Sequence, residues 1–167
     1  MDKLALGAFT ASLINTEAVA GSTNSWTNAV ASQCVIRGKY TVQLATNSNQ
    51  AETPTTDANT GAAFVAITPN KCAAVVFGVN AAGTIVGVQG PLEDTFVGVT
   101  TTVGAFKNAP QFPPIPDDFC PIAYTIIRCA PSGGAGFVVG TTQWAASSMS
   151  CTTFKNIAVL PDRPQIA

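Results

Sequence analysis

Residues 71–88 read KCAAVVFGVNAAGTIVGV, and this stretch decides the fold. It holds two apolar runs, residues 72–79 and residues 84–88, separated by the turn sequence NAAG at residues 80–83. Val and Ile favour strands, whereas Asn and Gly favour turns. Neither run alternates apolar with polar residues, so we expect strands that are buried on both faces. The core of the domain is expected to cover one face, and a neighbouring subunit the other.

The rest of the chain repeats this pattern of short strands and turns. Further runs rich in strand-forming residues, bounded by Gly, Pro and Asn, occupy residues 35–44, 63–68, 95–103, 122–129, 136–142 and 152–159. Residues 47–60 are polar and contain Pro54, which predicts a long loop. No amphipathic helical pattern alternates with the runs, so a parallel α/β sheet is disfavoured. The sequence therefore predicts an all-β fold, either an antiparallel β-sandwich or a jelly-roll-like barrel.

The domain organisation follows from the flanks of these runs. A chain of 167 residues suits one domain. We predict an extended N-terminal arm over residues 1–33, a β-sandwich domain over residues 34–160 and an extended, Pro-rich C-terminal tail over residues 161–167. Residues 4–20 are mostly apolar, but polar interruptions and the absence of a basic leader argue against a cleaved signal or a membrane span.

A proline-rich segment stands out within the domain. Five of the twelve residues 110–121 are proline, which fixes an extended path. Proline cannot donate to a strand ladder, so this segment is predicted not to be a central strand. We call residues 110–118 the strap, and expect it either to cross the end of the sandwich or to lie on a partner.

Charge is scarce in this chain, and that scarcity excludes several functions. Charged residues make up 10% of the chain, against about 25% in average soluble proteins, and histidine is absent. Without histidine there is no Ser-His-Asp catalysis and no histidine metal site. Eight basic residues spread along the chain form no basic patch, so we expect no nucleic-acid partner. Residues 72–92 and 129–153 carry no charge at all, and we predict that the sheets they form are the subunit interface.

The polar residues that might carry chemistry have simpler interpretations. The adjacent acids Glu93-Asp94 and Asp117-Asp118 are interpreted as turn or cap residues, with catalysis or weak cation binding as the alternatives. The glycine-rich residues 133–136 predict a hairpin loop rather than a phosphate cradle. Three serines lack a histidine partner for nucleophilic catalysis: Ser25, Ser132 and Ser147.

The tryptophans and cysteines are interpreted in the same way. Trp26 and Trp144 are predicted core or interface anchors, with stacking on sugar rings as the alternative. Five cysteines without a CxxC pair predict small buried hydrophobes, and a disulfide between Cys120 and Cys129 stays open. We therefore predict no catalytic, cofactor-binding or metal-binding residue, no cofactor, and a protein that is not an enzyme.

The C-terminal third carries a resemblance. Residues 112–127 (FPPIPDDFCPIAYTII), 140–144 (GTTQW) and 160–164 (LPDRP) resemble a pattern in small structural proteins of tailed-bacteriophage particles. The composition, rich in Ala, Thr, Gly and Val, is similar to that of capsid decoration (cement) proteins. The resemblance implies a small β-rich protein on the outside of the phage head, often a trimer, that clamps neighbouring major capsid subunits. It implies no catalytic residues.

These observations combine into one functional expectation. We expect a virion structural protein, a capsid cement protein made in the host cytoplasm and located on the capsid surface. Its expected partners are copies of itself, as a homotrimer, and the major capsid protein, with no nucleic acid and no membrane. Either the arm or the tail would lie over adjacent capsid subunits. The alternative is a tail-fibre module or a receptor- or carbohydrate-binding β-sandwich.

Overall fold

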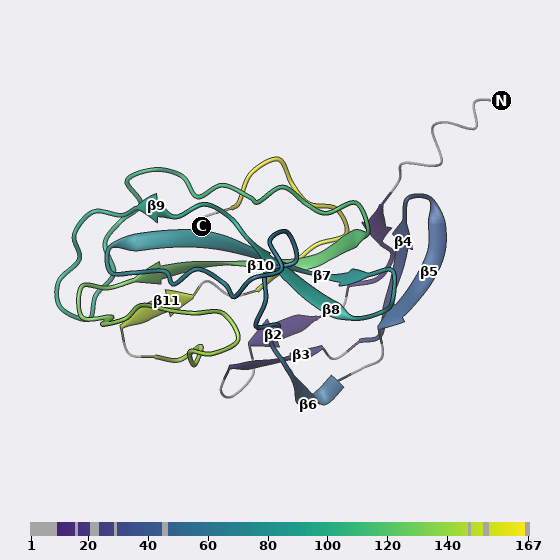
Figure 1. Ribbon diagram of the computed structural model, residues 1–167, viewed down its shortest axis with the longest axis horizontal. Coiled ribbons are helices and arrows are strands. Elements are labelled where there is room, and N and C mark those ends of the chain that lie inside the picture. Colours follow the sequence, from purple (N-terminus) through teal and green to yellow (C-terminus); the bar gives the residue numbers. More distant parts are fainter. Residues whose placement is uncertain are drawn as a thin grey trace.

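A computed structural model shows an all-β protein built from antiparallel sheets (Figure 1). The structure describes residues 10–15, 17–20, 24–28, 30–44, 47–146, 148–151 and 154–165. Within these residues there are twelve strands and no helix, arranged in three sheets. The all-β, antiparallel prediction is therefore confirmed. Strand order in the largest sheet is linear, so this sheet does not close into a barrel.

Two long strands form the centre of the largest sheet. They are β7 (Lys71–Asn80) and β10 (Phe119–Cys129), which pair with each other. The flanking strands are β8 (Ile85–Gln89) and β9 (Glu93–Asp94) beside β7, and β11 (Met149–Cys151) and β12 (Lys155–Asn156) beside β10. The sequence stretch 71–88 thus forms the predicted strand, turn and strand.

Two smaller sheets come from the N-terminal part of the chain. One contains β1 (Ala11–Ser12), β4 (Ser32–Ile36) and β5 (Lys39–Leu44), and the other β2 (Ala18–Ala20), β3 (Ser25–Asn28) and β6 (Asn47–Glu52). The prediction of a loop from residue 47 is wrong for β6, because pairing with β3 overrides the weak strand propensity of this polar segment. Residues 10–33 contribute three strands and the start of a fourth.

The prediction that the proline-rich residues 110–121 avoid the central strands is wrong at their end. Pro121 lies within β10, opposite Gly78 of β7. The register shifts between Pro121 and Ala123, and the pairing of β10 with β12 begins only at Ala123. A bulge tolerates a residue that cannot donate to the ladder, which is how the strand accommodates the proline. The bulge also interrupts the alternation of side chains between the two faces of the strand, so the neighbours Ile122 and Ala123 both belong to the larger core.

Both faces of β7 are buried within the single chain. Val75 and Phe77 lie in the larger core, while Val76 lies in a second core on the opposite face. All three residues are at most 2% exposed. The prediction that the neutral sheets form the subunit interface is therefore wrong for β7, because the chain itself already covers both faces.

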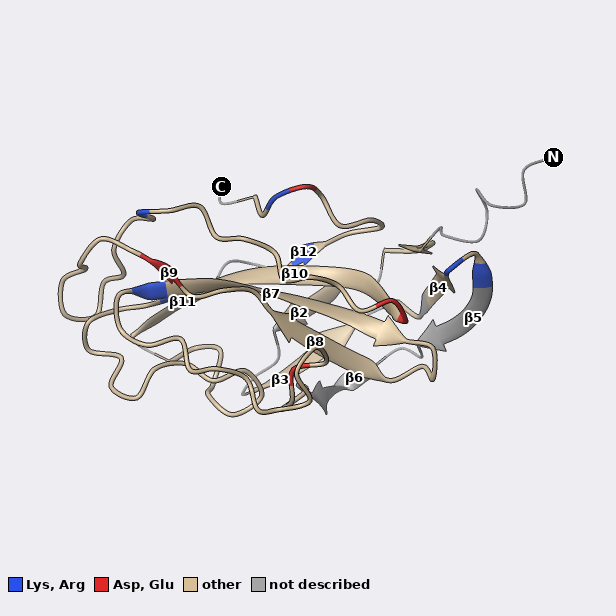
Figure 2. Ribbon diagram, turned by 45° about the horizontal axis from the view of Figure 1, so that its top comes forward, with Lys and Arg blue, Asp and Glu red and all other residues tan. Residues whose placement is uncertain are grey.

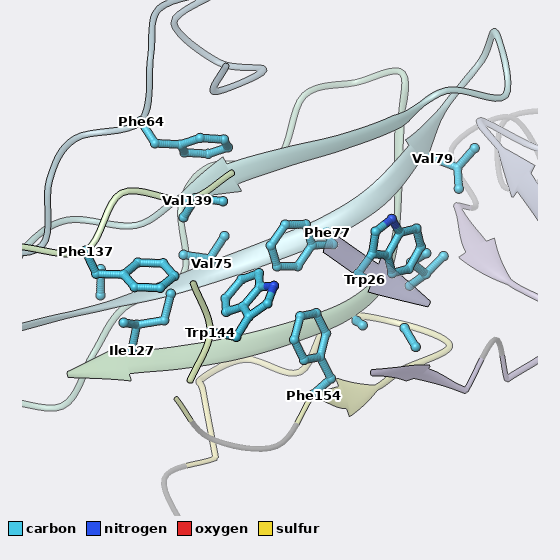
Figure 3. Packing of buried hydrophobic residues seen from close by; sticks show 14 of the residues in the cluster. Trp26, Phe64, Val75, Phe77, Val79, Ile127, Phe137, Val139, Trp144 and Phe154 are labelled. Carbon is cyan, nitrogen blue, oxygen red and sulfur yellow. The ribbon is translucent and has the colours of Figure 1, made fainter. Parts of the chain in front are cut away.

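Aromatic residues from distant segments meet in the larger core (Figure 3). Phe77 stacks on Phe154 at 5.5 Å and meets Trp144 edge-on at 6.2 Å between ring centroids. Phe137 lies 5.3 Å from the Trp144 ring. Residues 63–68 and 136–142 are predicted strands, but they form loops joined by a single bridge between Ile67 and Phe137. Their apolar residues still fill the core, so in the sequence a buried loop of this kind looks like a buried strand.

The strap and the C-terminal tail cover the second core. Phe112 of the strap meets Tyr124 edge-on, with ring centroids 4.9 Å apart, and Ile115 and Leu160 pack against the same cluster. The Gln165 backbone N–H donates a 3.0 Å hydrogen bond to the Tyr124 hydroxyl. The strap therefore lies on a sheet face of its own chain, rather than at the end of the sandwich or on a partner as predicted.

Charge is confined to the margins of this architecture (Figure 2). The ribbon is uncharged along β8 and almost all of β7 and β10, and the charged segments sit at strand ends and in connecting loops. Strand interiors buried on both faces leave no room for a solvated charge.

Candidate functional site

The two predicted acidic pairs lie apart and are engaged in structural contacts. Asp94, in β9, forms an ion pair with Lys71, and this neighbour holds the pKa of the Asp94 carboxyl below its ordinary value. Asp117 lies in a turn and forms an ion pair with Arg37. Lys71 and Asp94 lie at the end of the sheet where β7 begins, and Asp117 at the end where β10 begins. The structure therefore does not bring the two pairs together. Asp117 confirms the turn interpretation, which is wrong for Glu93 and Asp94, because these two residues form strand β9.

Both tryptophans are core residues. Trp26 is 1% exposed and Trp144 is 7% exposed, and both belong to the larger core. The Trp144 indole N–H donates a 2.8 Å hydrogen bond to the Ser25 carbonyl. The prediction of core anchors is confirmed, and the alternative of a sugar-stacking platform is wrong, because a buried ring cannot stack on a ligand in solvent.

The candidate serines and the glycine-rich residues 133–136 have structural roles where the structure describes them. The Ser132 N–H donates a 3.0 Å bond to the Thr100 carbonyl, and Ser25 is buried beside Trp144. Ser147 lies outside the described residues. Residues 133–136 form a turn in the long connection between β10 and β11, closed by a 2.8 Å bond from the Gly136 N–H to the Gly133 carbonyl.

Four cysteines are buried, as predicted: Cys34, Cys72, Cys120 and Cys129. Cys120 and Cys129 are nine positions apart on one strand, which is about 30 Å, so the disulfide left open by the sequence cannot form. Cys34 lies beside Cys120 instead, and a hydrogen bond with it raises the pKa of Cys120, as does burial. The side chain of Cys151 lies outside the described residues.

Neither a metal cluster nor a membrane helix is found in the part of the chain that the structure describes. No three His, Cys, Asp or Glu side chains gather there in a way that would hold a metal ion. Among the same residues, no helix has the length and apolar character needed to cross a bilayer.

Sequence reasoning missed Asp57, a buried carboxylate that organises a loop. One oxygen accepts backbone bonds from Asn59 (2.8 Å) and Thr60 (3.2 Å), and the other accepts a bond from the Gln89 N–H (2.7 Å). These bonds hold the loop against the end of β8. The sequence Asp-Ala-Asn-Thr-Gly at residues 57–61 is typical of such a side-chain-capped turn, and this signal could have identified it.

Sequence reasoning also missed an exposed hairpin over residues 95–106. The strand predicted over residues 95–103 folds back on itself, with isolated bridges joining Thr95 to Phe106 and Val99 to Thr102. The backbone groups of Val99 and Thr102 exchange two hydrogen bonds, of 3.1 and 2.7 Å. The hairpin lies next to β9, at one end of the molecule.

Three apolar residues of this hairpin are exposed to solvent. We call Phe96, Val97 and Val99 the hairpin tip; their exposed fractions are 58%, 78% and 75%. They supply three of the eight large hydrophobic residues that are exposed in the described part of the chain. Clustered apolar residues on a surface are typical of interaction sites. The hairpin tip is thus the strongest candidate for a functional surface.

The backbone of the hairpin is tightly constrained. A Cβ added to Gly98 would lie 2.0 Å from the Thr102 carbonyl oxygen, and one added to Gly104 would lie 1.6 Å from that of Phe96. Thr100 adopts a φ of 47°, which is unfavourable for a β-branched residue. Its carbonyl is held by Ser132. Strained, well-held backbone of this kind is concentrated at functional sites.

An apolar groove lies at the other end of the sheet. It has a volume of about 670 Å³, and its apolar walls come from Ile115, Phe119, Val159 and Leu160. The ion pair of Arg37 and Asp117 stands at its edge, where both side chains are largely exposed. We call this hollow the strap groove, because the strap provides one of its walls.

Comparisons with known proteins give no further guide to the site. No family model matches the chain, and neither a curated protein nor a solved structure is significantly similar to it.

Proposed function

We propose that this chain is a structural protein of a bacteriophage virion, namely a capsid cement protein that assembles as a homo-oligomer on the major capsid shell. One observation carries the proposal: a rigid hairpin holds Phe96, Val97 and Val99 in solvent. A free monomer gains nothing from such a surface, whereas an assembly buries it.

The distribution of charge supports the same function. Charged residues make up only 10% of the chain, and in the described part they lie mostly at strand ends and in connecting loops (Figure 2). Low charge reduces the solubility of a free protein and favours association. We base the kind of assembly that we propose, a phage capsid, on the resemblance of residues 112–127 to phage structural proteins.

The proposed mechanism is mechanical and needs no chemical step. Each copy contacts its neighbours and the shell through small apolar surfaces. Many such contacts on one particle add through multivalency, so that the lattice is held more strongly than any single contact suggests.

The proposal is tested with heads of the encoding phage that lack this protein. Purified chain is mixed with the expanded heads, sedimented, and the decorated particles are imaged. We expect co-sedimentation and added density at local three-fold positions on the outer surface. Density on tail fibres would support the alternative of a receptor-binding module. An absence of binding to any part of the particle would overturn the virion role.

A further inference from the structure

We infer that the hairpin tip of one copy inserts into the strap groove of a second copy, forming a head-to-tail contact. This inference rests on the proposed function for the existence of a homo-oligomer, but not for the capsid. It names the two surfaces that meet, and it is argued below from their position, their chemistry and their rigidity.

The two surfaces lie at opposite ends of the molecule. Phe119, the first residue of β10, lines the strap groove. Arg128, near the last residue of β10, donates a 3.2 Å bond to the Gly104 carbonyl of the hairpin. Nine strand residues span about 30 Å. The hairpin follows β9, while Arg37 of the groove lies between β4 and β5 at the far end (Figure 1). The hairpin tip of one copy therefore cannot reach the groove of the same copy.

The chemistry of the two surfaces matches. Residues 95–106 contain no charged residue, so inserting the hairpin tip buries no charge. The groove offers apolar walls, and its two charged residues, Arg37 and Asp117, are already paired with each other at the edge. A volume of about 670 Å³ is within the range of roughly 300–1,000 Å³ that accommodates several side-chain-sized groups. No charge is left unpaired by the contact, which removes the main penalty for burial.

The hairpin is ordered before it binds. Gly98 and Gly104 allow its two strands to approach closely, and Ser132 holds the turn at Thr100. Ordering a flexible loop on binding weakens affinity, so a preformed hairpin retains more of the gain from apolar burial.

The symmetry of the assembly follows from the difference between the two surfaces. A hairpin and a groove are not self-complementary, so the contact is heterologous rather than two-fold. A heterologous contact propagates from copy to copy until it closes into a ring or extends as a filament. A ring of three copies is the closed form that agrees with the proposed function.

The test uses one variant of each surface and a matched control. Val97→Asp changes the hairpin tip, and Val159→Asp changes the groove; both valines are exposed, so both variants should fold. Val65→Asp is the control, because Val65 is 62% exposed but belongs to neither surface. Native mass spectrometry and sedimentation give the oligomeric state, and unfolding curves verify that each variant is folded.

We expect an oligomer for the wild type and the Val65→Asp control, and monomers for the other two variants. A charge buried without a partner should weaken the contact by more than about 100-fold. An equimolar mixture of Val97→Asp and Val159→Asp should form dimers only, because one intact hairpin tip and one intact groove remain. This rescue by mixing is specific to a head-to-tail contact.

Several results would overturn the inference. A wild type that stays monomeric at about 100 µM excludes the contact at useful affinity. If Val159→Asp keeps the wild-type mass, the groove is not used by a second copy; occupation by residues 1–9 of the same chain would give this result. If only Val97→Asp dissociates and mixing gives no dimer, the hairpin contacts itself across a two-fold axis or contacts another partner.

The outcome is separable from that of the proposed function. An oligomer that dissociates and recombines as described, but does not bind phage heads, retains the head-to-tail contact and overturns the capsid role. A chain that binds heads as a monomer overturns the head-to-tail contact and retains the capsid role.

Discussion

Val75 and Val76 are neighbours on β7, yet their side chains lie in different cores. Each lies between β8 and β10, and each is fully buried. If the single chain covers both faces, Val75→Ala and Val76→Ala should lower the free energy of unfolding by similar amounts, and these losses should not depend on protein concentration. If a second subunit covered one face, one of the two variants would have little effect on the isolated chain.

The expected loss can be worked out from the buried groups. Val→Ala removes two methyl-sized groups, which lose about 1.6 kcal/mol of transfer free energy. A residual cavity of roughly 40 Å³ adds about 1 kcal/mol at about 24 cal/mol per Å³. Each variant should therefore lose about 1.6–2.6 kcal/mol of unfolding free energy. In a chain of this size that lowers the Tm by about 3–10 °C.

The assay is urea unfolding followed by the fluorescence of the buried Trp26 and Trp144. Val65→Ala is the matched control, because Val65 is 62% exposed and lies in neither proposed contact surface, so its truncation should change stability by less than about 0.5 kcal/mol. Curves are measured at about 1 µM and about 50 µM, since a stability that depends on association changes with concentration. The reasoning is refuted if either core variant matches Val65→Ala, or loses stability at only one concentration.

Three further predictions concern the hairpin, the buried carboxylate and a buried thiol. Gly104→Ala should destabilise the chain by about 1–3 kcal/mol in urea and weaken its oligomer, because the new Cβ would overlap the Phe96 carbonyl. Asp57→Asn should lower the free energy of unfolding by about 1–3 kcal/mol in the same assay. Both oxygens of Asp57 accept bonds from backbone N–H groups, and the NH2 group of asparagine cannot accept one, so a backbone donor would lose its partner. An unchanged midpoint would contradict this. Burial, assisted by the Glu93 carboxylate, raises the pKa of Cys72 from 9.0 to about 11, so the folded state holds this proton more tightly than the unfolded chain. Stability should be full below pH 9 and fall as the pH rises to about 11. Cys72→Ser should make that decline shallower in a series of urea curves at rising pH, and the remaining decline belongs to Cys120 and Cys129, whose pKa values are also raised.

The chain's own residues predict a good part of the fold. The runs of strand-forming residues at 72–79 and 122–129 form β7 and β10, because such runs favour strands and show no alternation of apolar with polar residues. Burial of both faces is equally evident from the missing alternation. The core positions of Trp26 and Trp144 follow from the usual fate of large aromatic rings in a small domain.

The candidate site could not be predicted from the sequence. An apolar residue in a sequence predicts burial, so Phe96, Val97 and Val99 look like an ordinary strand. Their exposure depends on Gly98 and Gly104, which let the segment fold back, and on Ser132, which holds the turn from a distant position. The strap groove likewise combines residues around positions 37, 117 and 160, which no local pattern connects.

By itself, then, the sequence determines which segments extend, which lack charge and which must leave water, because strand preference and hydropathy are properties of neighbouring residues. Only the tertiary structure decides what covers each face. Phe112 of the strap and Leu160, the residue before the tail, occupy the face that the sequence assigned to another subunit. With both faces of β7 covered by other parts of the chain, the hairpin tip stays exposed to solvent. The surplus apolar surface at one end of the sheet, and the groove at the other, are consequences of that packing.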